Sequence, residues 1–297
     1  MNAVILQNLV KRFGKKNALD NISLELPENC IVGLIGRNGA GKTTLLKTLA
    51  GYLRPTEGRV TVLGQQPFDN IRVLSDIVFM DDERYNDSAV LWDLVDQAAL
   101  SYSRFDKVTA LKLLDYFNIP VKSKIKKLSK GMKTLFSLVI ALLSRSPLTM
   151  LDEPTIGLDA AHRKEFSSLL LKDYTNHPRT IIVSSHLISE LEGLMEQAVL
   201  IDQGKLIFNK AIEDVQNYAL YLSGHRRVLE ELEGRHSIIY KESMGEMLVL
   251  GVVNSLSEEE LRELESSGVE ISAMSVQDVC VNLTATNKGG VLDVIAK

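Results

Sequence analysis

The first two hundred residues contain several short apolar runs that end at glycine or at polar residues. The clearest of them are residues 30–35, 77–80, 148–151 and 180–185. Apolar runs of this length without alternation are typical of strands that are buried on both faces of a parallel sheet. The pattern therefore predicts an α/β fold built around such a sheet.

Two other patterns accompany these runs. Residues 4–9 and 22–26 look like strands, and the second alternates between apolar and polar positions, so we expect an antiparallel β subdomain. From residue 88 to residue 118, apolar side chains recur at spacings of three and four. This spacing is typical of amphipathic helices and predicts a helical subdomain from about residue 88 to about residue 146.

The periodicity changes after residue 209. Strand patterns and helix patterns then alternate, with strands at 219–222, 237–240, 247–253 and 271–274 and helices at 225–233 and 257–266. This alternation predicts a small α+β domain with a ferredoxin-like arrangement. We therefore expect two domains, residues 1–212 and residues 213–297.

A glycine-rich segment follows the first apolar run. Residues 36–43 read Gly-Arg-Asn-Gly-Ala-Gly-Lys-Thr, and a segment suited to a helix comes next. This is the G-x-x-x-x-G-K-T pattern of a phosphate-binding loop, in the strand–loop–helix context that the loop requires. Its glycines let backbone N–H groups point at phosphate oxygens. Lys42 is expected to reach the β- and γ-phosphates, and the Thr43 hydroxyl to ligate Mg²⁺.

Polar side chains follow three of the apolar runs. Asp152 and Glu153 stand where nucleotide-binding α/β proteins hold Mg²⁺. Because side chains alternate along a strand, we expect one carboxylate to face the metal and the other an attacking water. Asp82 belongs to an acidic cluster that is either solvated or holds water near a metal. His186 stands at a strand end, where ligands bind, although a lone histidine is more often structural.

Composition narrows the classes of partner. The 297-residue chain has a net charge of −4, so there is no global attraction for nucleic acid. Its only cysteines, Cys30 and Cys280, suit a reducing compartment. The N-terminus lacks the features of a signal peptide, and the most apolar stretch, residues 135–143, is far shorter than the ~20 residues that span a bilayer. Any membrane role is therefore expected to go through a partner. The six lysines of residues 122–133 indicate either a solvated face or an anion-attracting surface.

Three further patterns make the chain similar to the ATP-binding cassette (ABC) ATPases. Residues 128–132 read Leu-Ser-Lys-Gly-Met and resemble the family signature L-S-G-G-Q. Residues 152–159 read Asp-Glu-Pro-Thr-Ile-Gly-Leu-Asp and resemble the family run D-E-P-T-x-G-L-D. His186 stands at the place of the family's switch histidine. The resemblance covers about residues 1–209 and implies a P-loop NTPase core.

The resemblance implies a role for each matching residue. Phe13, which could otherwise be a core aromatic, would stack on the adenine of ATP. Glu153 would act as general base, and His186 would contact the γ-phosphate. Asp152 would assist Mg²⁺, and Asp82, in the place of the family's glutamine, would meet the metal or its water. The phosphates would be wrapped by Gly36, Arg37, Asn38, Gly39, Ala40, Gly41, Lys42, Thr43 and Thr44. Ser129, Lys130 and Gly131 would close over ATP bound to a second cassette, and Asp159 would lie at that dimer interface.

The resemblance also implies the working partners. We expect a cytoplasmic ATPase subunit, peripheral to the inner face of the cell membrane, that drives an integral membrane permease. It would pair with a second cassette, either itself or a paralogue, and would not bind nucleic acid. Residues 275–284 resemble the ending of bacterial export-type subunits, which favours export of peptides, antimicrobials or other amphipathic compounds.

Departures from the family pattern keep two alternatives open. Asp82 appears where the family has glutamine, and Lys130 and Met132 replace glycine and glutamine in the signature. These changes would suit a regulatory or sensor cassette that binds ATP with little turnover. A soluble nucleic-acid-associated ABC ATPase is disfavoured, because this chain has one cassette and no heptad array.

Overall fold

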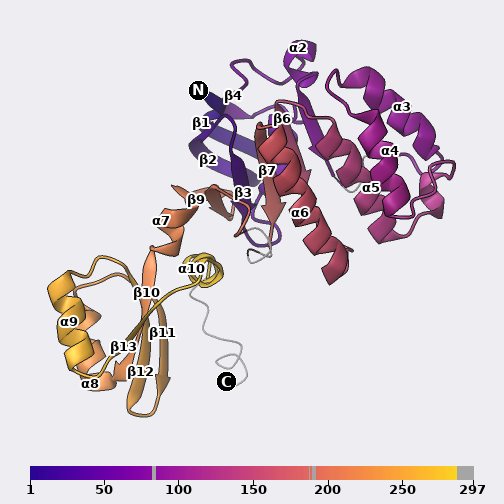
Figure 1. Cartoon of the computed structure of the whole chain (residues 1–297). Helices are drawn as coiled ribbons and strands as arrows, with labels where there is room; N and C mark the ends of the chain where they lie inside the picture. The colour runs from indigo at the N-terminus through magenta and orange to yellow at the C-terminus, as the bar shows by residue number, and fades with distance from the viewer. Residues whose placement is uncertain (82–84, 187, 189–191, 286–297) are drawn as a thin grey trace. The chain divides into compact units, whose positions relative to one another are not determined.

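The computed structural model describes residues 1–81, 85–186, 188 and 192–285, and it divides into two compact units, Met1–Asn209 and Lys210–Lys297. The first unit is centred on a six-stranded sheet in the order β5-β6-β7-β3-β8-β9 (Figure 1). Its strands are β3 (Ile31–Ile35), β5 (Ile77–Met80), β6 (Leu148–Asp152), β7 (Thr180–Ser185), β8 (Gln197–Asp202) and β9 (Lys205–Ala211). Strands β5, β6, β7, β3 and β8 pair in parallel, as their apolar runs predict.

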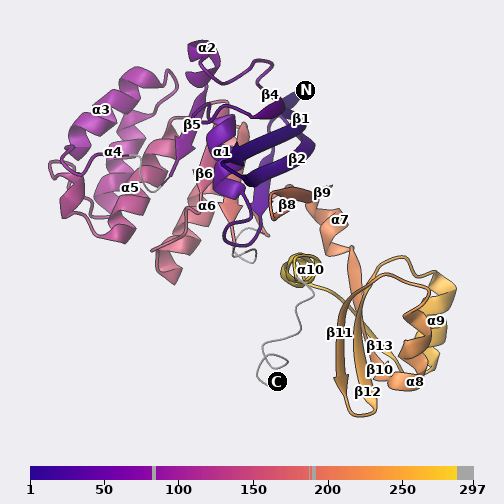
Figure 2. The same ribbon diagram turned by 180° about the vertical axis from the view of Figure 1, so that it is seen from behind.

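Helices cover both faces of this sheet. α6 (Ala160–Asn176) lies in front of β6 and β7 in Figure 1, and α1 (Lys42–Leu49) covers the opposite face, seen in Figure 2. Every residue of β3, β6 and β7 is buried. Because neighbouring parallel strands run the same way, the ends of β3, β6 and β7 place their following residues along one edge of the sheet.

A second, antiparallel sheet packs on the α1 side. It has the order β2-β1-β4 and consists of β1 (Asn2–Phe13), β2 (Lys16–Pro27) and β4 (Glu57–Val62). Its apolar side chains share one hydrophobic core with α1 and the six-stranded sheet, which includes Leu6, Leu24 and Leu46. The β1–β2 turn is thereby fixed beside the loop that joins β3 to α1.

The helical subdomain contains α3 (Leu91–Ser101), α4 (Lys107–Tyr116), the 3₁₀ turn η1 (Ile125–Lys127) and α5 (Lys130–Leu143). These helices lie together beside the central sheet in both ribbon views (Figures 1 and 2). Residues 134–143 of α5 are all buried, since this helix packs against α4 and also against β5 and β6. A short helix, α2 (Ile71–Leu74), precedes β5.

The second unit carries an antiparallel sheet in the order β11-β12-β10-β13. Its elements follow the chain order β-α-β-β-α-β of ferredoxin-like folds, and its core contains Leu222, Leu250 and Leu264. The elements are α7 (Ile212–Gln216), β10 (Ala219–His225), α8 (Arg226–Leu229), η3 (Glu230–Leu232), β11 (Ile238–Met244), β12 (Met247–Val253), α9 (Glu258–Ser266), β13 (Glu270–Ala273) and α10 (Val276–Leu283).

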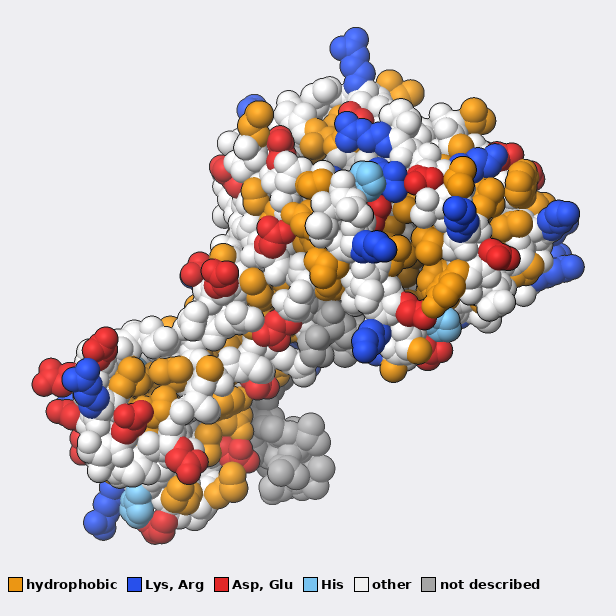
Figure 3. Space-filling model, viewed as in Figure 1, with side chains coloured by type: hydrophobic (Ala, Val, Ile, Leu, Met, Phe, Trp, Pro, Cys, Tyr) orange, Lys and Arg blue, Asp and Glu red, His pale blue; other side chains and the backbone are white. Residues whose placement is uncertain are grey.

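Charged side chains of both signs are mixed on one face of the first unit. On the face drawn in Figure 3, lysines and arginines stand among acidic and apolar side chains rather than in one continuous field. Mixed charge of this kind does not create the strong single-sign potential that attracts polyanions. Among the described residues, no helix is long and apolar enough to span a bilayer.

Candidate nucleotide site

The loop between β3 and α1 has the geometry of an anion cradle. Gly39 and Gly41 have φ values of 82° and 112°, in the left-handed region that favours glycine. Gly41 is the N-cap of α1, and no side chain caps this helix. The first N–H groups of α1 are therefore left for oxygens of a bound anion, at the positive end of the helix dipole.

Close backbone packing fixes the position of this loop. A Cβ atom at Gly36 would lie 2.4 Å from the carbonyl oxygen of Ile201, and one at Gly41 would lie 2.7 Å from that of Ala18. Both contacts are too short for a real side chain. The β8–β9 hairpin supports the loop as well, because the N–H of Gly204 donates to the carbonyl of Ala40 at 2.8 Å.

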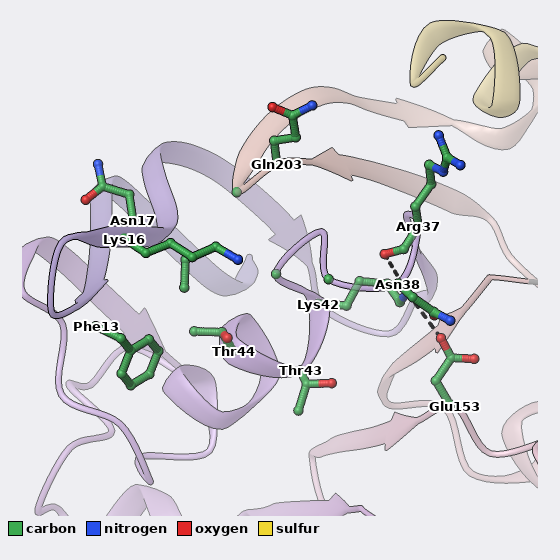
Figure 4. Close-up of a pocket in the computed structure, with 14 residues that line it drawn as sticks. Phe13, Lys16, Asn17, Arg37, Asn38, Lys42, Thr43, Thr44, Glu153 and Gln203 are labelled. Atoms are coloured by element: carbon green, nitrogen blue, oxygen red, sulfur yellow. Dashed lines mark hydrogen bonds and ion pairs between the residues drawn. The ribbon is translucent and has the colours of Figure 1, made fainter. Parts of the chain in front are cut away.

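Lys42 is held over the loop by three oxygens. Its ammonium group donates to the carbonyl of Gly36 at 2.6 Å and to that of Arg37 at 3.5 Å, and it lies 3.1 Å from Oε1 of Glu153 (Figure 4). The Lys42 side chain is only 6% exposed. Burying a cation is costly without a counter-charge, and Glu153 supplies that charge. A phosphate group could take the same place.

Asp152 joins the loop to the edge of the sheet. Its Oδ2 accepts a hydrogen bond from the Thr43 hydroxyl at 2.6 Å, and its Oδ1 accepts one from the Ser184 hydroxyl at 2.6 Å. The Thr43 hydroxyl and the Asp152 carboxylate thus form a pair of hard oxygen donors directly beside the phosphate loop. Such oxygens suit Mg²⁺, which takes few protein ligands and completes its shell with phosphate and water.

Glu153 and Asp152 do point in different directions, but the expected reason was wrong. The strand β6 ends at Asp152, and Glu153 adopts a left-handed backbone with φ 47°, so a turn rather than strand alternation separates the two carboxylates. The N–H of Glu153 donates to the Ser184 hydroxyl at 2.9 Å, which stabilises this turn. A left-handed backbone at a non-glycine residue costs on the order of 1–3 kcal/mol, so the surrounding contacts have to hold Glu153 in this conformation.

His186 lies on the other side of the Glu153 carboxylate. Its Nδ1 is 2.7 Å from Oε2 of Glu153, and its side chain is 36% exposed. Glu153 therefore bridges Lys42 and His186, with one oxygen on each. This arrangement brings together the phosphate loop, the end of β6 and the end of β7, which are more than 30 residues apart in sequence.

Phe13 stands at the opposite end of the same cavity. Its side chain is 50% exposed, which excludes the reading of Phe13 as a core aromatic. The cavity has a volume of about 770 Å³, large enough for a nucleotide. It is lined by Phe13, Lys16, Asn17, Ala18, Arg37, Asn38, Gly39, Gly41, Lys42, Thr43, Thr44, Glu153, Gln203 and Gly204.

Several of these lining residues were missed by the sequence analysis. Lys16, Asn17 and Ala18 open strand β2 directly after the β1–β2 turn, and Gln203 and Gly204 form the β8–β9 turn (Figure 4). The positive φ values of Gln203 and Gly204, 47° and 78°, are those of a two-residue hairpin turn. The sequence signals such turns, but nothing in it places either turn beside a phosphate loop.

The signature-like residues lie away from this cavity. Ser129 is the N-cap of α5, and its hydroxyl accepts from the N–H of Met132 at 3.2 Å. Lys130 lies against Gly157, where a Cβ atom would stand 3.2 Å from the Lys130 Cγ. Gly131 packs as closely, because its Cβ would lie 2.9 Å from the carbonyl oxygen of Gly157. Neither Ser129, Lys130 nor Gly131 lines the cavity.

Asp159 caps the helix α6. Its carboxylate accepts from the N–H of His162 at 2.9 Å, and this hydrogen bond is the main reason why the pKa of Asp159 is lowered. The Asp159 side chain is 65% exposed. Asp82, predicted near the metal, lies outside the described residues. Among those residues, no group of three or more histidine, cysteine, aspartate or glutamate side chains could hold a metal ion.

Comparisons with known proteins agree with this geometry. The family model described as ABC transporter matches residues 19–156. An uncharacterized ABC transporter ATP-binding protein of Methanocaldococcus jannaschii is 30% identical over 265 residues, which are 85% of this chain and 96% of that protein. This chain belongs to the ABC transporter ATP-binding family. The resemblance seen in the signature and in residues 152–159 is thereby confirmed.

Two further relatives extend the comparison. The lantibiotic transport ATP-binding protein SrtF of Streptococcus pyogenes is 32% identical over 213 residues, 71% of this chain and 92% of that protein. A solved dimeric ATP-binding cassette in a post-hydrolysis state, bound to ADP and phosphate, superposes with a TM-score of 0.62. It is 22% identical and covers 70% of this chain and 98% of its own, so it supports the fold. The predicted α/β P-loop fold is confirmed, and the ABC chain is an ATP-binding and ATP-hydrolysing subunit.

Proposed function

We propose that this ABC ATPase subunit hydrolyses ATP in the cavity between Phe13 and the phosphate loop. The proposal rests chiefly on one observation, the bridge that Glu153 forms between Lys42 and His186 beside that loop. Phe13 stacks on the adenine ring, and residues 36–44 receive the phosphates on their N–H groups. The γ-phosphate takes the place of the Glu153 oxygen beside Lys42, and His186 contacts it from the other side.

Displacement from Lys42 frees Glu153 for catalysis. Its carboxylate accepts a proton from the water that attacks the γ-phosphorus, while the bond from that phosphorus to the leaving oxygen of ADP breaks. The left-handed turn at Glu153 and its hydrogen bond to Ser184 keep the carboxylate at the edge of the sheet. Thr43 and Asp152 would hold Mg²⁺, which when bound would neutralise charge on the phosphate oxygens.

The cassette works in pairs in this proposal. Ser129, Lys130 and Gly131 of one cassette close over the ATP of the other, and Asp159 lies at their interface. The exposure of Ser129 and Asp159 and their distance from their own cavity fit a role in a partner's site. ATP then favours the closed pair of cassettes, and hydrolysis reopens it. The pair thus has the two alternating states that transport needs.

The driven partner is an integral membrane permease, with the ATPase at the inner, cytoplasmic face of the cell membrane. The transported class is peptides, antimicrobials or other amphipathic compounds, moved outward. The similarity to the lantibiotic transport protein SrtF and the export-type pattern of residues 275–284 support this direction. The mixed surface charge of the first unit fits a protein without a nucleic-acid partner (Figure 3).

Replacement of Glu153, the proposed general base, tests the proposed mechanism of hydrolysis. Glu153→Gln removes the carboxylate that takes the proton but keeps its size, so steady-state ATP turnover should fall at least about a hundredfold. ATP affinity, measured by calorimetric titration, should stay the same or rise, because Lys42 loses its competing counter-charge. Lys42→Ala is the contrasting variant and should weaken ATP binding strongly. Wild-type turnover by Glu153→Gln would rule out the proposed base.

A pull-down tests the partner. Tagged Glu153→Gln protein is recovered from solubilised native membranes in the presence of ATP and Mg²⁺, and the proteins that accompany it are identified. An integral membrane protein in near-equal amount supports the permease, and a second cassette in the eluate would identify a heterodimer. Recovery without any membrane protein would instead favour the regulatory cassette with little turnover.

A further inference from the structure

Phe13 is an exposed aromatic residue at the end of a strand. Its ring can be held in one orientation only if a neighbouring group contacts it. It is the last residue of β1, and its partner across the antiparallel ladder is Lys16, the first residue of β2. Half of its side chain is exposed. Ordering a free side chain on ligand binding reduces affinity, so a ring that is already held in place binds more tightly.

The side chain of Lys11 holds the Phe13 ring in place. Its ammonium group lies over the Phe13 ring, 5.1 Å from the ring centroid, and also donates to the carbonyl of Arg54 at 2.8 Å. Phe13 lines the nucleotide cavity whereas Lys11 does not. The cation therefore approaches the ring from outside the cavity and leaves the ring accessible to a base.

The carbonyl that anchors Lys11 is itself fixed. The N–H of Thr56 donates to the carbonyl of Val10 at 2.8 Å, and the N–H of Arg12 donates to the Thr56 hydroxyl at 3.0 Å. Arg12 also pairs with Glu57 at 3.3 Å. The loop of residues 54–57 is thus tied to β1 on both sides of Lys11. The Arg54 carbonyl that accepts from Lys11 therefore belongs to a segment that is held against β1.

We infer that Lys11 is a positioning residue for the base of the nucleotide, acting through Phe13. A cation attracts the negative face of an aromatic ring and so restricts the orientation of that ring. It also draws π density away from the opposite face, which lessens repulsion between that face and the π face of a purine. This inference rests on the proposed stacking role of Phe13, which nucleotide titration tests separately.

Titration with and without a base isolates the effect. ATP and inorganic tripolyphosphate are titrated calorimetrically against the full chain and its Lys11→Met and Lys11→Arg variants. Lys11→Met should weaken ATP binding about two- to fivefold, the size of an exposed cation–π contact, and leave tripolyphosphate binding unchanged. Lys11→Arg should restore most of the ATP affinity, because arginine also binds an aromatic face and donates to a carbonyl. Lys15→Met, which removes an exposed lysine from the neighbouring β1–β2 turn, is the matched control and should change neither titration.

A double-mutant cycle with Phe13→Ala gives the decisive comparison. Once the ring is absent, Lys11→Met should cause no further loss of ATP affinity. An equal loss in the Phe13→Ala background, an equal loss for tripolyphosphate, or no loss at all would overturn the inference. If Phe13→Ala itself binds ATP as well as the parent, the stacking role fails and the inference fails with it. A loss with Phe13→Ala but none with Lys11→Met would overturn the inference alone.

Discussion

At the scale of single residues, the site depends on side chains that hold the reactive groups in place. Ser184 is the clearest of them, because its buried hydroxyl joins the Asp152 carboxylate to the backbone of Glu153. It donates to Asp152 and accepts from the N–H of Glu153. The sequence indicated the charged residues but gave no reason to single out one serine within a buried strand.

Loss of the Ser184 hydroxyl should therefore reduce turnover. Ser184→Ala leaves an oxygen of Asp152 and the N–H of Glu153 without their partner, a loss of roughly 1.5–3 kcal/mol for a hydrogen bond to a charged group. We expect kcat to fall about tenfold to a hundredfold. ATP affinity measured without Mg²⁺ should change much less, because Ser184 does not line the cavity. Steady-state assays measure kcat, and titration measures ATP affinity. An unchanged kcat would contradict the role of Ser184 in turnover.

At the scale of elements, ion pairs connect the helical subdomain to the central sheet. Asp106, the N-cap of α4, accepts from the N–H of Thr109 at 3.0 Å and from Arg145 at 3.2 Å. Arg145 also contacts Asp173 of α6, which pairs with the buried Arg179 just before β7. One chain of contacts thus runs from α4 through the end of α5 to α6.

Substitution of Asp106 separates the helix cap from the ion pair. Asp106→Ala removes both and should lower the free energy of unfolding by about 0.5–2 kcal/mol. Asp106→Asn keeps an acceptor for the N–H of Thr109 and should cost less. Denaturant unfolding at pH 7 compares the three proteins, and equal stability of Asp106→Ala and the parent would contradict a capping role.

The same variants should show a defined pH dependence. The hydrogen bond from the N–H of Thr109 is the main cause that lowers the pKa of Asp106 below its ordinary value. A lowered pKa means that the folded state favours the ionised form, so this contribution to stability is complete above about pH 4 and is lost as the pH falls through the folded-state pKa. The stability difference between the parent and Asp106→Asn should accordingly shrink below about pH 4. A difference that grows on acidification would contradict this assignment.

At the scale of the whole molecule, the proposed nucleotide cavity lies within the first unit. Every residue that lines the cavity belongs to Met1–Asn209. A ligand that binds only the folded state stabilises it, by about 2.7 kcal/mol at a hundred times its dissociation constant. ATP at that excess should raise the Tm of the first unit by roughly 5–10 °C. Differential scanning calorimetry measures the shift, and Lys42→Ala should abolish it; a shift that persists in this variant would place the binding elsewhere.

The sequence alone determined the fold class, the phosphate loop and the identity of the two carboxylates. These follow from local information, because apolar runs define the strands and a glycine-rich loop between strand and helix has few other uses. The ends of β3, β6 and β7 could be expected to meet, since they are parallel neighbours in one sheet.

Only the tertiary structure decided the contacts between distant segments. The turn at Glu153 overrode strand alternation because its N–H is paired with Ser184, 31 positions further along the chain. The start of β2 and the β8–β9 turn reach the cavity because both pack on the backbone at Gly41 and Ala40. Such contacts depend on how sheets and helices pack against one another, which hydrophobic periodicity within a single segment does not encode.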